Sequence, residues 1–112
     1  MREYTERLDK VRLESFAVTA AEFDAAGRTL TLEQLEALHR AIGTVTRFHA
    51  TQSLAAVRLE TSPGVVCERV MVPLAAVGLY VPGGRAVYPS SVVMNVIPAQ
   101  LAGVGSIAIA ST

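Results

Sequence analysis

The first half of the chain places apolar residues at helical spacing behind two helix-start motifs. Thr19-Ala-Ala-Glu22 and Thr31-Leu-Glu-Gln34 match capping boxes, in which a threonine hydroxyl and the side chain three residues later each accept a free backbone N–H. The first box predicts a short helix. After the second, leucine, isoleucine and valine recur every three or four residues, which predicts an amphipathic helix over about Leu32 to Gln52.

A β-hairpin is predicted next. Residues 56–61 alternate apolar and charged side chains, which is the pattern of a half-exposed strand. The segment 62–65 reads Ser-Pro-Gly-Val and fits a type II turn, because proline suits the second position and glycine the positive φ of the third. The chain then returns over 65–72, so the two strands are predicted to pair antiparallel.

The last third of the chain has the order strand, glycine-rich loop, helix and strand. Val77 to Val81 is a short apolar run, and Pro82 ends it, because proline lacks the N–H that a strand ladder needs. A long apolar segment over about 90–103 predicts a helix, and the run Ser106 to Ala110 predicts a second strand. This order is typical of a βαβ unit with parallel strands, so the predicted fold class is α/β.

The loop between the first of these strands and the helix is a candidate ligand site. Gly83 and Gly84 can adopt positive φ and let a ligand approach the bare backbone. The following helix start presents free N–H groups that attract anions, and ligands of parallel sheets bind at the carboxyl ends of the strands. The chemistry indicates a nucleotide or another anion. A plain structural turn fits the spacing better, because the loop is neither G-x-G-x-x-G nor a P-loop.

Four side chains near this loop have both a functional and a structural interpretation. Tyr80 could lay its ring against a flat ligand or be a buried strand tyrosine. Arg85 could hold a phosphate or be a solvated loop arginine. Ser90 and Ser91 could touch a ligand, but capping of the helix is the favoured role for them.

The sequence predicts no metal site. His39 and His49 would lie roughly 15 Å apart along one helix, too far to share an ion within one chain. Cys67 has no histidine or cysteine at metal-ligand spacing, so a small strand residue is the favoured interpretation.

Composition excludes several classes of protein. The 10 Lys and Arg balance the 10 Asp and Glu, so there is no basic surface typical of nucleic-acid binding. No uninterrupted apolar run reaches the length of a membrane-spanning helix. Charged residues directly follow Met1, which argues against a signal peptide, and the single cysteine fits a reducing compartment. We therefore expect a cytoplasmic protein.

Several stretches together resemble the histidinol dehydrogenase family, in the right order and over essentially the whole chain. They include long motifs around the glycine-rich loop and in the helix after it, with shorter ones upstream. The stretches are Phe48–Gln52, Glu60–Val65, Arg69-Val70, Pro73, Val77–Gly84, Tyr88–Asn95 and Ile97–Val104.

The resemblance implies an activity and a set of cofactors. Histidinol dehydrogenases oxidise L-histidinol to L-histidine through the aldehyde, with two NAD in succession and a bound Zn²⁺, as homodimers with incomplete Rossmann-like domains. Tyr80 stands where the family has an NAD-contacting tyrosine, and Pro82, Gly83 and Gly84 are second-line candidates for NAD binding. The family's zinc ligands and catalytic Glu-His pair have no counterpart here, so no catalytic or metal residue is assigned.

The enzymes of this family are much longer than 112 residues. The chain resembles an internal piece of their amino-terminal half, and its end directly after a strand favours a truncation. We expect residues 1–72 to form a helical region with the hairpin and residues 73–112 an incomplete NAD-binding-like βαβ unit. We also expect a homo-oligomer that is inactive alone. The alternative is a stand-alone, non-catalytic module for nucleotide binding or protein interaction.

Overall fold

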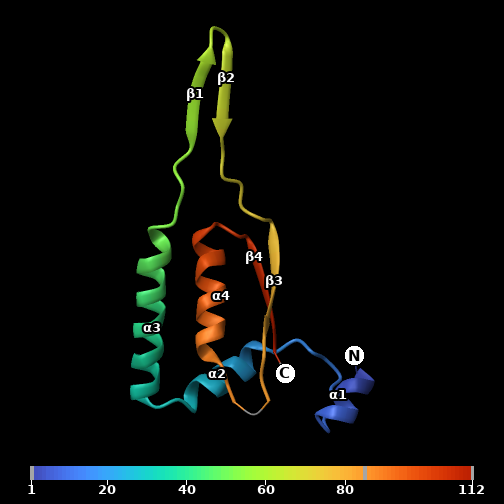
Figure 1. Cartoon of the computed structure of the whole chain (residues 1–112). Helices are drawn as coiled ribbons and strands as arrows, with labels where there is room; N and C mark the ends of the chain where they lie inside the picture. The colour runs from blue at the N-terminus through green and yellow to red at the C-terminus, as the bar shows by residue number, and fades with distance from the viewer. Residues whose placement is uncertain (1, 85, 112) are drawn as a thin grey trace. The chain divides into compact units, whose positions relative to one another are not determined.

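The computed structural model describes residues 2–84 and 86–111 and combines helices with strands (Figure 1). In chain order the elements are α1 (Arg2–Leu8), α2 (Ala20–Arg28), α3 (Leu32–Ala50), β1 (Val57–Ser62), β2 (Val65–Arg69), β3 (Ala76–Val81), α4 (Pro89–Leu101) and β4 (Ser106–Ser111). The chain divides into two compact units, Met1–Leu35 and Glu36–Thr112. The expected division into a helical and hairpin region (1–72) and a βαβ unit (73–112) stays a prediction. In the part of the chain that the structure describes, no helix is long and apolar enough to cross a membrane.

Both predicted capping boxes are confirmed. The Thr19 hydroxyl accepts the Glu22 N–H at 3.3 Å, and the Glu22 carboxylate accepts the Thr19 N–H at 2.7 Å. The backbone and hydroxyl hydrogen bonds from Thr19 hold the pKa of Glu22 below its usual value, since they favour the charged carboxylate. Thr31 and Gln34 form the same reciprocal pair at the start of α3.

The helix α3 ends two residues before its predicted limit. After Ala50, the N–H of Thr51 bonds to the carbonyl of Phe48 and that of Gln52 to His49, so the chain leaves the helix through tighter, three-residue turns. Such turns are frequent at helix ends.

The hairpin is confirmed as an antiparallel pair of β1 and β2. Gly64 has a φ of 78°, as the third position of a type II turn requires. The second strand ends at Arg69, three residues earlier than predicted. Arg69 pairs with Val57, the first residue of β1, so the residues after it have no strand to pair with.

The predicted βαβ unit is confirmed, because β3 and β4 pair in parallel and α4 connects them. A Schellman motif ends α4: the Val104 N–H bonds to the Ala99 carbonyl and the Gly103 N–H to the Gln100 carbonyl. Gly103 has the left-handed φ that this motif needs, 82°. The chain then turns directly into β4.

The predicted capping of α4 by Ser90 or Ser91 is wrong. The helix begins at Pro89, one residue earlier, and its N-cap is Tyr88, which makes no side-chain capping bond. Proline suits the first helical position, because its fixed φ is helical and its missing N–H would have no partner there. Both serines therefore lie inside the first turn.

The core of the second unit lies between α4 and β3, which pack against each other. Val81 of β3 is 4% exposed and Val93 of α4 is 8% exposed. Among the described residues these are the only buried apolar side chains. Much apolar surface of α4 and of the segment before β3 stays open, including Met94, Leu101 and Leu74.

Replacing Gly103 with alanine should destabilise the second unit by about 1–2 kcal/mol, because a side chain disfavours left-handed φ. The added Cβ would meet Pro73 at 3.5 Å, an ordinary contact, so the backbone conformation carries the cost. Gly27→Ala is the control. A Cβ at Gly27 meets nothing within 4 Å, and alanine should stabilise α2 by up to about 1 kcal/mol. Urea unfolding followed by circular dichroism measures the stability of both variants. Equal unfolding midpoints for the two variants would contradict the role of the left-handed φ at Gly103.

The Thr19 capping box should depend on pH. Since the pKa of Glu22 is lowered in the folded chain, its stabilising contribution is present above the ordinary value of 4.5 and is lost as pH falls through the folded value. An NMR titration of the Glu22 carboxyl should show this lowered midpoint, and Thr19→Ala should raise it.

Thr31→Ala is the matched control for this titration, because its box uses the neutral Gln34. It should leave the midpoint of Glu22 unchanged. A Glu22 midpoint that is the same in the Thr19→Ala variant would show that the box does not set it.

Candidate functional site

The candidate loop begins at the carboxyl end of β3. Val81, the last residue of the strand, is buried, while Pro82 and Gly84 are exposed and Gly83 is half-buried. Gly84 has a φ of 107°, a conformation that other residues rarely adopt, and a Cβ added there would meet nothing within 4 Å. The glycine is therefore needed for the backbone path, and open space lies next to it.

Tyr80 presents its ring to solvent, with 65% of the residue exposed. The alternative of a buried strand tyrosine is therefore wrong. Along β3, Val77, Leu79 and Val81 are the more buried positions, and α4 packs against this strand. Because side chains alternate along a strand, Tyr80 lies on the opposite face of the sheet.

That opposite face carries small side chains apart from Tyr80. Its residues pair as Ala76 with Ser106, Gly78 with Ala108, and Tyr80 with Ala110. Small neighbours such as alanine and glycine leave room around an aromatic ring, which can stack on a flat group. The arrangement can accept a flat, partly apolar group next to the carboxyl end of β3.

The loop ends at the start of α4. Its first turn contains no acidic side chain, so no fixed negative charge competes with an anion for the positive end of the helix dipole. Arg85, the predicted phosphate contact, lies outside the described residues. Within the helix, the side-chain amide of Asn95 donates a hydrogen bond to the backbone carbonyl of Ser91 at 2.7 Å.

The histidines and the cysteine lie apart. The His49 Nδ1 lies 2.6 Å from the Gln52 Oε1, and its ring meets the Phe48 ring edge-on. His39 is exposed on α3, and Cys67 is exposed on β2 with its Sγ 3.8 Å from the Thr61 hydroxyl. Within residues 2–84 and 86–111, no group of three His, Cys, Asp or Glu could hold a metal ion.

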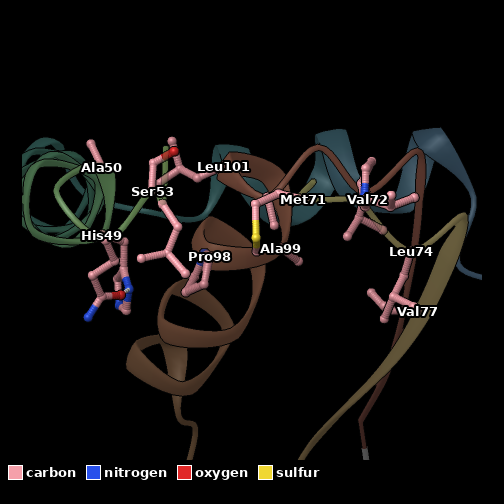
Figure 2. Close-up of a pocket in the computed structure, with 15 residues that line it drawn as sticks. His49, Ala50, Ser53, Met71, Val72, Leu74, Val77, Pro98, Ala99 and Leu101 are labelled. Atoms are coloured by element: carbon pink, nitrogen blue, oxygen red, sulfur yellow. Dashed lines mark hydrogen bonds between the residues drawn. The ribbon is translucent and has the colours of Figure 1, made fainter. Parts of the chain in front are cut away.

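A second feature is an apolar groove of about 640 Å³ in the second unit (Figure 2). Its walls are three segments: the end of α3 with the residues after it (49–54), the chain leading into β3 (71–77) and the end of α4 (98–104). The sequence analysis missed this groove. The sequence feature that could have indicated it is the apolar run 70–74. The predicted second strand of the hairpin accounts for only part of this run, because that strand ends at residue 72.

Comparisons with known proteins agree with the fold and the motifs. The family model for histidinol dehydrogenase matches residues 1–112. The chain belongs to the histidinol dehydrogenase family. It is 43% identical to the histidinol dehydrogenase of Vibrio vulnificus, over 97% of this chain and 25% of that protein. It is 45% identical to that of Geobacillus kaustophilus, over 99% of this chain and 26% of that protein.

A solved structure shares the fold. The crystal structure of histidinol dehydrogenase from Elizabethkingia anophelis superposes with a TM-score of 0.93 at 36% identity, covering 98% of this chain and 25% of that one. The resemblance noted in the sequence is thus confirmed. The chain spans about a quarter of the length of these relatives and corresponds to a fragment of their amino-terminal region.

Proposed function

We propose that this chain supplies an NAD-contacting loop to a histidinol dehydrogenase, an enzyme that oxidises L-histidinol to L-histidine in histidine biosynthesis. The observation that carries the proposal is the exposed ring of Tyr80, two residues before the open backbone at Pro82 to Gly84. In a cytoplasmic homodimer of this family, the loop would form one part of the cofactor site.

The residues of the loop fit the two chemical parts of a dinucleotide. The Tyr80 ring offers a flat surface to an aromatic base. Gly84 leaves the backbone open to close approach, and the start of α4 favours negative charge such as a pyrophosphate. When bound, NAD supplies the hydride acceptor of the reaction.

Zinc does not fit the described residues, since no three metal-ligating side chains come together in them. In the proposed enzyme, the zinc ligands and the catalytic base belong to the three quarters of the family sequence that lie outside this match. This chain therefore contributes binding and positioning, and its 112 residues alone should not turn over substrate.

Tyr80→Ala should weaken NAD binding by roughly one order of magnitude, since stacking of a base on an aromatic side chain contributes about 1–3 kcal/mol. NMR titration of the isotope-labelled chain with NAD measures it, with shifts expected at Tyr80, Gly83 and Gly84. Tyr80→Phe is the control and should bind nearly as well, because it keeps the ring. Equal affinity for all three proteins, or shifts confined to other residues, would remove Tyr80 from the site.

The purified chain should form no NADH from L-histidinol with NAD and zinc supplied, because its described residues assemble no metal-ligand group and the family's catalytic Glu-His pair has no counterpart in it. Absorbance at the NADH band measures this against a blank without protein. NADH production that rises with the amount of protein would show that the chain is catalytic by itself.

A further inference from the structure

The groove is lined mainly by apolar residues. Of its 15 lining residues, only His49, Gln52 and Ser53 are polar, and none is Asp, Glu, Lys or Arg. Figure 2 shows side chains from the three walls around the hollow. Without an Asp, Glu, Lys or Arg side chain, such a surface has no permanently charged partner for a phosphate, a nucleic acid or a charged peptide. It fits apolar side chains.

Two of the three walls of the groove are held together by short contacts. The Ser106 N–H donates to the Ala75 carbonyl at 3.2 Å, which ties the end of the α4 turn to the chain before β3. A Cβ on Gly105 would lie 3.4 Å from that same carbonyl oxygen, and one on Gly103 3.5 Å from Pro73. The chain before β3 and the end of α4 are therefore held close together, so two of the three walls of the groove are positioned by the chain itself.

Large apolar side chains along the groove are exposed. Leu74 is 66% exposed, and Leu54, Met71, Val72 and Leu101 are exposed as well. Monomeric soluble proteins rarely leave a large contiguous apolar cluster open, and such clusters often mark interaction sites or ligand-binding grooves.

The comparisons show how much of a related polypeptide lies outside this match. The same fold recurs in a histidinol dehydrogenase chain of which this match is 25%, so three quarters of that polypeptide lie outside it. We propose that the groove is a docking surface for an apolar segment of these remaining three quarters, and that the two parts assemble even as separate polypeptides. The inference shares with the proposed function the premise that the chain works within such an enzyme, but not the NAD site.

The test is complementation. The chain is produced together with a tagged Vibrio vulnificus histidinol dehydrogenase from which the matching quarter has been removed. Tag purification followed by size exclusion with light scattering measures assembly. The wild-type chain should co-purify in a one-to-one ratio with its partner, and Leu74→Asp should reduce the recovered chain at least about tenfold, because a carboxylate cannot enter an apolar groove.

Leu59→Asp is the matched control. Leu59 is also an exposed leucine, 59% exposed, but it lies on β1 away from the groove. This variant should co-purify like the wild type. Circular dichroism of the isolated chains should give the same helix content for both variants, and Leu74→Ala should give an intermediate loss, which separates docking from misfolding.

Three results would overturn the inference. They are co-purification of Leu74→Asp at the wild-type level, failure of the wild-type chain to recover any partner, and a dimer of the isolated chain that Leu74→Asp dissociates. The last result would make a second copy the occupant of the groove. Assembly that follows this pattern while Tyr80→Ala leaves NAD binding unchanged would retain the docking surface and reject the proposed function.

Discussion

The parallel pairing of β3 with β4 is the constraint on which the rest of the second unit depends. Parallel neighbours cannot be joined by a tight turn and need a crossover, and α4 is that crossover. The helix must then stop sharply, which the left-handed Gly103 achieves. The loop between β3 and α4 therefore lies at the carboxyl end of β3, where ligands of parallel sheets commonly bind.

The same pairing makes the two faces of the sheet unequal. The face towards α4 buries Val81, while the other face exposes Tyr80 among alanine, glycine and serine. A ligand that stacks on Tyr80 and also reaches the start of α4 would have to cross the end of β3. The open backbone at Gly84 lies on that path. A bulky residue with ordinary φ could not occupy this place without redirecting the loop.

Features set by neighbouring residues could be predicted from the sequence. The capping boxes at Thr19 and Thr31 and the turn at Gly64 each involve residues within three or four positions, so the local chemistry decides them. The prediction that Ser90 or Ser91 caps α4 was wrong for an equally local reason. Pro89 determines where that helix begins, and the hydroxyls that follow it come too late to cap.

Features that join distant segments could not be predicted in this way. The end of β2 depends on where β1 begins, and the groove exists only because the ends of α3 and α4 meet the chain before β3. The burial of side chains also differs between local and distant contacts. Local motifs set the starts of α2 and α3 and the hairpin turn, yet only Val81 and Val93 are buried apolar residues among the described ones. Burial of apolar surface is the dominant favourable contribution to the free energy of folding. The sequence therefore specifies the local elements of this chain, while their own packing buries little apolar surface.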